Sequence, residues 1–181
     1  MYYILKIITI IFILIPRNLS LKLGRLLGLM FYYFIPIRKK IAEKNILLAF
    51  PNLNNKEIQQ LIKKCYQHFG IVLIDFFRMP ILNRKNITNI FSFKYESSEL
   101  LKSHAGGIVM TGHLGNWEMF IPGFGLNNFP ISIVTQTQKN KSAEKFFNWV
   151  REKENTQLIP KKESKEIMKQ VLIQHKFLGL A

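Results

Sequence analysis

Apolar side chains dominate the first 37 residues. Residues 1–16 are apolar apart from Lys6 and Thr9, and a second apolar stretch covers residues 19–37. This pattern predicts a membrane-associated segment over residues 1–37. Neither half offers the roughly 18 uninterrupted apolar residues of a spanning helix, so two arrangements stay open: a tilted or kinked span, and a helical pair lying in the interface.

Helical spacing governs residues 38–80. The stretch 41–50 predicts a short helix stopped by Pro51, and a longer helix is expected from Asn54 to the region before Pro80. Asn54 is a plausible N-cap, with Glu57 three residues later as in a capping box. The apolar stripe of the long helix keeps helical spacing and consists of Ile58, Leu61, Ile62, Cys65, Phe69, Val72, Leu73 and Phe76.

From residue 90 onward short β-prone runs alternate with helical ones. The runs IFSFKY (90–95), GIVM (107–110), ISIV (131–134) and KFLGL (176–180) are the clearest of the β-prone type. This alternation predicts an α/β domain with a mixed or mainly parallel sheet covered by helices. The continuously apolar runs suit strands that helices cover on both faces. We therefore expect a membrane-anchor segment at 1–37 and one domain over 38–181.

The stretch GIVMTGHLGNWE (107–118) joins an apolar strand to a helix and carries His113 and Glu118. Such junctions lie at the carboxyl ends of parallel strands, where α/β proteins bind ligands. Five positions do not share a helix face, so the two side chains meet only if the backbone turns at Gly112 and Gly115. The pair then forms a base oriented by a carboxylate. In the alternative, Glu118 merely places negative charge at a helix start.

The amino-acid composition says less about function than the motif does. The chain has 181 residues, with 26 Lys and Arg against 11 Asp and Glu, a formal net charge of +15. This charge favours an anionic partner without choosing among nucleic acid, acidic protein and membrane surface. The sequence shows no zinc motif, disulfide framework or nucleic-acid-binding motif, so we expect no metal and no nucleic-acid partner.

The phrase HLGNWE (113–118) closely resembles the His-x4-acid motif of the bacterial lipid A biosynthesis acyltransferases, within the lysophospholipid acyltransferase superfamily. Residues 42–80, which contain NILLAFP, and the segment VTQTQKN at 134–140 are also similar to that family. Arg151 aligns with a family arginine associated with acyl-donor or phosphate binding. Two departures stand out: Thr135-Gln136-Thr137 replaces a frequent Tyr-Arg-Pro, and Asn155 replaces a frequent glycine.

The resemblance implies transfer of a fatty acyl group from acyl carrier protein to a hydroxyl of a lipid A precursor, an anionic glycolipid, with no metal or redox cofactor. In this role His113 is the general base and Glu118 orients it. Asn116 shapes the turn or donates a hydrogen bond near the oxyanion, with helix capping as its alternative role. Arg151 would bind a phosphate.

The resemblance also bears on location and completeness. It implies the bacterial inner membrane, and the basic triplet at 38–40 places the catalytic part on the cytoplasmic side if the anchor spans. Family chains continue beyond a strand like KFLGL, so this chain is expected to be a fragment or a truncated product. A catalytically inactive, membrane-bound remnant is therefore the alternative to an active enzyme.

Overall fold

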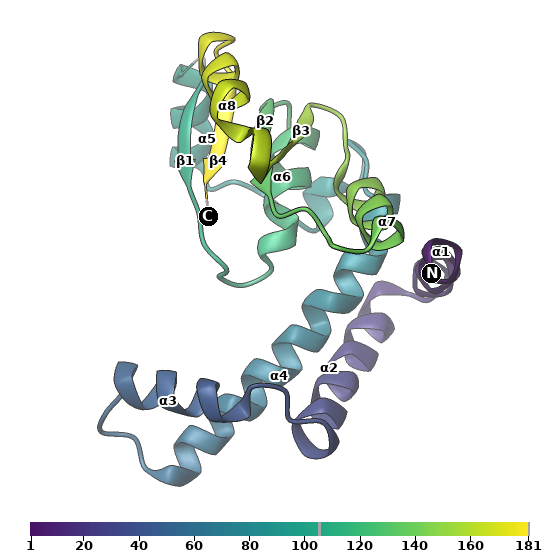
Figure 1. Cartoon of the computed structure of the whole chain (residues 1–181), viewed down its shortest axis with the longest axis vertical. Helices are drawn as coiled ribbons and strands as arrows, with labels where there is room; N and C mark the ends of the chain where they lie inside the picture. Colours follow the sequence, from purple (N-terminus) through teal and green to yellow (C-terminus); the bar gives the residue numbers. More distant parts are fainter. Residues whose placement is uncertain (105, 181) are drawn as a thin grey trace. The chain divides into compact units, whose positions relative to one another are not determined.

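The computed structural model describes residues 1–104 and 106–180, apart from the side chain of Glu163. It divides into two compact units (Figure 1). A sheet unit contains residues 1–10 and 78–180, and a helical unit contains residues 11–77. Each unit is described separately below.

The helical unit contains α2, α3 and all but the last residue of α4, whereas most of α1 belongs to the sheet unit. The four helices that contribute to it are α1 (Tyr2–Leu14), α2 (Arg17–Phe34), α3 (Lys39–Ala49) and α4 (Asn55–Arg78). The predicted capping box is confirmed. Asn54 N donates to Glu57 Oε2 at 2.8 Å, and Glu57 N donates to Asn54 Oδ1 at 3.1 Å. These bonds satisfy amide donors that would otherwise lack an acceptor at the start of α4.

Glycine allows α2 and α4 to pack closely. A Cβ atom at Gly70 would collide with the Gly24 carbonyl oxygen, and one at Gly28 would collide with the Tyr66 carbonyl oxygen. Since these obstacles are backbone atoms, a side chain at either position would force the helices apart. An ion pair between Arg17 and Asp75 adds a polar link between the same two helices.

The predicted apolar stripe of α4 is only partly buried. Ile58, Ile62 and Val72 have exposed fractions of 1%, 0% and 4%, whereas Phe69 is 62% exposed. Cys65 is also exposed, although it is one of the predicted stripe positions. The stripe of large apolar positions is wider than the face that α2 covers. Helical spacing therefore identified the helix but overestimated its buried face.

The sheet unit contains a four-stranded parallel sheet in the order β1-β4-β2-β3. Its strands are β1 (Gly107–Met110), β2 (Ile131–Thr135), β3 (Thr156–Pro160) and β4 (Phe177–Leu180). The connecting helices are α6 (Phe120–Leu126), α7 (Lys141–Arg151) and α8 (Ser164–Ile173), with α5 (Tyr95–Ser103) before β1. Short 3-10 helices lie at η1 (Met79–Ile81), η2 (Ile87–Asn89), η3 (Trp117–Met119) and η4 (Lys161–Glu163). The prediction of an α/β fold is confirmed.

Helices pack on both faces of the sheet (Figure 1). On one face Phe124 of α6 meets Ile131 and Phe177, and on the other Val171 of α8 meets Ile159 and Leu178. Neighbouring residues 177 and 178 thus point to opposite faces, as the two-residue period of a strand requires. This double cover explains why the strands are continuously apolar in sequence.

One expected strand is absent from the described chain. Residues 91–94 have no regular secondary structure, and α5 begins at Tyr95. The Phe91 ring occupies the space over Gly123 of α6, and the Phe93 ring lies 5.1 Å from the Phe124 ring. The alternating aromatic residues that suggested a strand therefore serve to pack a loop against α6.

None of the helices in the described part of the chain is both long enough and apolar enough for a membrane crossing.

Candidate active site

A cleft of about 530 Å³ opens at the carboxyl edge of the sheet. Its lining includes the segment after β1, the last residues of β2 and β4, and the start of α8. His113, Glu118 and Arg151 all line it, although 33 residues separate the last two in sequence. The structure therefore places these residues at the carboxyl ends of parallel strands, the position that we expected for His113 and Glu118.

His113 lies in a bend between β1 and η3, and its side chain is exposed. Gly115 has a φ of 55°, a left-handed conformation that glycine adopts without strain. The His113 ring packs beside Trp117, with 5.3 Å between the ring centroids and an interplanar angle of 49°. Trp117 is thus a packing partner of the imidazole.

Glu118 lies in η3, and both of its carboxylate oxygens bind Arg151. Arg151 Nε donates to Oε2 at 2.9 Å, and Nη2 donates to Oε1 at 2.8 Å. The two side chains are 13% and 16% exposed. A parallel two-bond contact of this kind fixes the orientation of both groups, and it is stronger in a partly buried cleft than at a free surface.

This pairing was not expected from the sequence, which assigned Glu118 to His113 and Arg151 to a phosphate. Among the described residues Glu118 and His113 share the cleft but not a hydrogen bond. The Nε–Nη2 edge of Arg151 is used by Glu118, so this edge does not face a phosphate. Arg151 also places its guanidinium 5.0 Å from the centroid of the Phe147 ring, one turn earlier on α7.

The far wall of the cleft supplies further polar groups. Thr135 ends β2 and Gln136 follows it, while Lys161 precedes α8 and Ser164 begins it. Thr135 and Gln136 belong to the segment that departs from the family pattern. Lys161 was not singled out from the sequence, because its lysine-rich neighbourhood gives no sign that it lies at a strand end. It follows Pro160, the last residue of β3.

A second hollow of about 520 Å³ lies beside the cleft and is more apolar in its lining. It shares Thr111, Gly112, Trp117 and Phe120 with the cleft. The residues that only the hollow uses are Phe91, Met110, Leu114 and Asn116. The 111–117 segment therefore has a polar cleft on one side and an apolar hollow on the other.

Asn116 precedes η3 and makes no side-chain capping bond to the described residues of that helix. The capping role that was the alternative for this residue is therefore not found. Its place in the lining of the apolar hollow keeps it close to the His113 segment. Its expected roles, shaping the turn or donating a hydrogen bond to an oxyanion, stay predictions.

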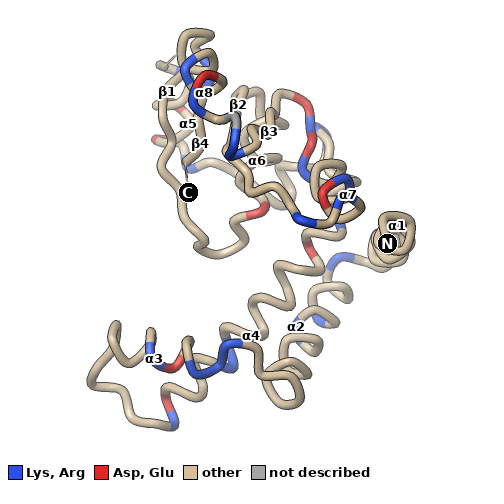
Figure 2. The backbone as a smooth tube through the Cα atoms, viewed as in Figure 1, with Lys and Arg blue, Asp and Glu red and all other residues tan. Residues whose placement is uncertain are grey.

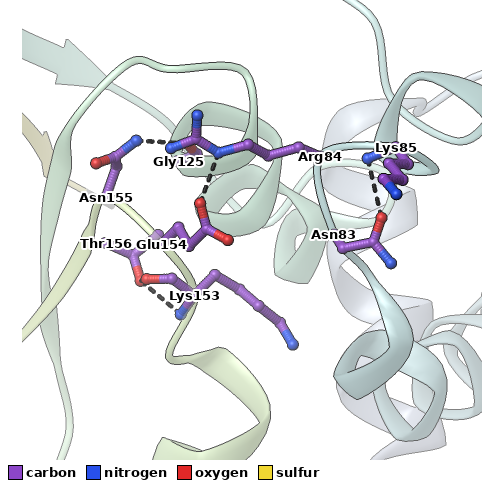
Figure 3. Close-up of polar contacts among 8 residues, drawn as sticks. All are labelled: Asn83, Arg84, Lys85, Gly125, Lys153, Glu154, Asn155 and Thr156. Carbon is purple, nitrogen blue, oxygen red and sulfur yellow. Dashed lines mark hydrogen bonds and ion pairs between the residues drawn. The ribbon is translucent and has the colours of Figure 1, made fainter.

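Asn155 lies at the opposite, amino-terminal edge of the sheet, just before β3 (Figure 3). Its φ is 59°, and its Nδ2 atom donates to the Gly125 carbonyl oxygen at 3.3 Å. Asparagine is among the residues that best tolerate a left-handed conformation, which accounts for an asparagine where the family frequently has glycine. This departure therefore concerns a turn and lies away from the cleft.

Lys153 occupies the same turn region (Figure 3) and donates from Nζ to the Pro80 carbonyl oxygen at 3.3 Å. Burial lowers the pKa of the Lys153 ammonium from the ordinary 10.5, because a low-dielectric surrounding disfavours the charged form. Nearby, Arg84 and Glu154 form an exposed ion pair.

Comparison with known proteins agrees with the resemblance of the motif. A profile of the bacterial lipid A biosynthesis acyltransferases matches residues 1–176 of the chain. The chain belongs to this family and is an acyltransferase. No curated protein sequence matches it.

Proposed function

We propose that this protein transfers a fatty acyl group from acyl carrier protein to a hydroxyl of a lipid A precursor. The observation that carries the proposal is the meeting of His113, Glu118 and Arg151 in one cleft at the carboxyl edge of the sheet. Family membership supplies the reaction class, and the cleft supplies a base, a carboxylate and two cationic side chains, Arg151 and Lys161.

In the proposed reaction His113 takes the proton of the acceptor hydroxyl as its oxygen attacks the thioester carbonyl carbon. A carbon–oxygen bond forms, and the carbonyl oxygen carries negative charge in the tetrahedral intermediate. When this intermediate collapses, the carbon–sulfur bond breaks and the imidazolium returns its proton to the departing thiolate. An imidazole suits both steps because the same ring nitrogen can accept a proton and later donate it.

Glu118 is proposed to stabilise the imidazolium and to orient His113, and Arg151 to hold Glu118 in place. The two-bond contact with Arg151 fixes the orientation of the carboxylate in the cleft. Each carboxylate oxygen has a second lone pair that can accept another hydrogen bond. Rotation of the glycine-flanked His113 segment would bring the ring to this acceptor when substrate binds.

The two hollows suggest where each substrate lies. An anionic glycolipid is proposed to place its polar head in the cleft, where Lys161 and Arg151 contribute positive charge. The acyl chain of the donor suits the apolar hollow, whose lining includes Phe91, Met110 and Leu114. The thioester would then lie over the shared 111–117 segment, next to His113.

The partners and the location follow the same proposal. The formal charge of +15 suits both an acidic carrier protein and a phosphate-bearing lipid (Figure 2). We propose that residues 1–37 attach the protein to the bacterial inner membrane, with the catalytic unit on the cytoplasmic side. No metal or cofactor takes part in this mechanism.

The test is transfer of a radiolabelled acyl group from acyl carrier protein to a lipid A precursor, measured with membranes that carry the full chain. We expect His113→Ala to lower the initial rate roughly 100-fold or more. His104→Ala is the matched control, because His104 is exposed and its Nδ1 atom bonds within α5 to the Leu100 carbonyl oxygen. Equal rates for wild type and His113→Ala would overturn the role of His113. Absence of transfer by wild type would favour the inactive, membrane-bound alternative.

A further inference from the structure

Helix α1 turns its polar side chains toward the protein. Residues 1–10 belong to the sheet unit. The Lys6 Nζ atom lies 4.4 Å from the centroid of the Trp149 ring on α7 and 5.2 Å from that of Tyr2. Thr9 is fully buried, and its hydroxyl donates to the Leu5 carbonyl oxygen at 2.9 Å. The Lys6 ammonium and the Thr9 hydroxyl thus both find partners on the inner face of this helix.

The outer face of the same segment is apolar. Tyr3, Ile4, Ile7 and Ile10 are exposed to 76%, 62%, 57% and 55%. Positions 3, 4, 7 and 10 share one side of an α-helix, so these side chains form a continuous stripe. A helix on the surface of a water-soluble protein has the reverse arrangement, with its apolar stripe inward and its polar residues outward. The outward stripe therefore suits an apolar environment outside the protein.

We propose that α1 lies in the plane of an anionic lipid surface, with this stripe inserted among the lipids and its inner face held by α7. The proposal rests on the membrane attachment proposed above and specifies its geometry. Contacts with Trp149 at the level of Lys6, and with Lys145 at the level of Tyr2, hold the helix along the protein surface. A helix that is fastened laterally in this way lies along the membrane, as interfacial amphipathic helices do.

Charge favours lipid over a second copy of the chain as the occupant. Lys141 and Lys145 of α7 are exposed, and the Lys145 Nζ atom lies beside this helix, 4.9 Å from the centroid of the Tyr2 ring. Figure 2 shows basic positions on α7. Two copies joined through α1 would bring these lysines together, whereas anionic headgroups would neutralise them. Since α7 also carries Arg151, the lipid-bound helix contacts the element that holds Glu118.

The first experiment is flotation of the purified full chain with vesicles of phosphatidylglycerol and phosphatidylethanolamine, and with vesicles of phosphatidylcholine alone. We expect preference for the anionic vesicles. Ile4→Ser and Ile7→Ser should each lower the vesicle partition coefficient roughly tenfold, because each removes a large apolar side chain from the lipid. Ile173→Ser is the matched control, since Ile173 is 67% exposed and lies on α8.

The second experiment separates in-plane from spanning attachment. In a Cys65→Ser background, single cysteines at positions 3, 7 and 10 carry an environment-sensitive fluorophore, and spin-labelled lipids measure its depth. An in-plane helix gives three similar, shallow depths. A spanning helix gives depths graded over about 10 Å from position 3 to position 10.

Failure of this inference is distinguishable from failure of the proposed function, because neither experiment requires acyl transfer. Graded depths overturn the in-plane geometry. Unchanged flotation of the Ile4→Ser and Ile7→Ser variants overturns the role of the stripe in lipid binding. The proposal is also overturned if the wild-type chain does not bind vesicles but forms a dimer that these two substitutions convert to a monomer. The rate of acyl transfer to a detergent-dispersed acceptor should stay within twofold of the wild-type rate in these variants, because surface substitutions away from the cleft leave the cleft intact.

Discussion

The chain contains two arginine–carboxylate pairs of the same geometry in two different settings. In the helical unit Arg17 donates from Nε to Asp75 Oδ1 at 3.2 Å and from Nη2 to Oδ2 at 2.6 Å. In the sheet unit Arg151 uses the same two nitrogen atoms on Glu118. Asp75 is 3% exposed and links α2 to α4, whereas Glu118 lines an open cleft. Similar contacts thus serve packing in one unit and, by our proposal, catalysis in the other.

The largest expected effect separates these two roles. Glu118→Gln should lower the rate of acyl transfer by roughly 10²–10⁴-fold, because the neutral amide cannot stabilise the imidazolium of His113. Initial rates at saturating acyl carrier protein measure this effect. Circular dichroism of the same preparation checks that the fold is retained.

Glu154→Gln is the control for this variant, since Glu154 pairs with Arg84 at the opposite edge of the sheet, where its side chain is 60% exposed. Its rate should equal that of wild type. A Glu118→Gln enzyme with wild-type activity would remove the distinction between the two pairs, because Glu118 would then be structural like Asp75.

A smaller effect is expected from the pair in the helical unit. Asp75→Asn should lower the free energy of unfolding by about 1–3 kcal/mol, because it leaves Arg17 without an ionised partner at a mostly buried position. Urea unfolding followed by far-UV circular dichroism measures the change. Trp117 and Trp149 both lie in the sheet unit, so tryptophan fluorescence reports that unit separately. A lower transfer rate with unchanged stability would contradict the packing role.

The smallest effect concerns Lys153, a charge in the sheet unit with no carboxylate partner among its described contacts. Its pKa is lower in the folded state than the ordinary 10.5 of the unfolded chain, so between these two values the unfolded state binds more protons. Stability attributable to this group therefore rises with pH across that interval. Lys153→Met should reduce the gain in urea stability as the pH rises toward 10.5. An unchanged gain would mean that burial of Lys153 does not contribute.

The sequence predicted the fold best where a local pattern determines the outcome. Asn54 and Glu57 stand three residues apart, and the capping box they form depends only on that spacing. The apolar runs at 107–110 and 131–134 lie in strands because burial on both faces requires continuous hydrophobicity. Phe91 and Phe93 led to a wrong prediction of a strand, because apolar and polar residues alternate in the same way on a strand and on a loop that packs against a helix.

The site was predicted in position but not in pairing. His113 and Glu118 follow a strand in sequence, so their place at the sheet edge was available from the order of elements. The partner of Glu118 was not, because Arg151 reaches it from the far end of α7 and only the strand order brings the two together. Lys161 was not predicted as a site residue for the same reason. Long-range geometry, rather than residue type, decides both contacts.

The strand order carries a consequence for synthesis of the protein. β4, the last of the four in sequence, lies between β1 and β2, and Gly107 of β1 pairs with Phe177. On a ribosome, β2 and β3 can pair as soon as residue 160 is available, but β1 has to wait for residues 177–180 before it gains a partner. The His113 segment is attached to the end of β1, so the candidate active site is assembled only after β4 has inserted. Chaperones that protect an unpaired apolar strand would have their longest opportunity on β1.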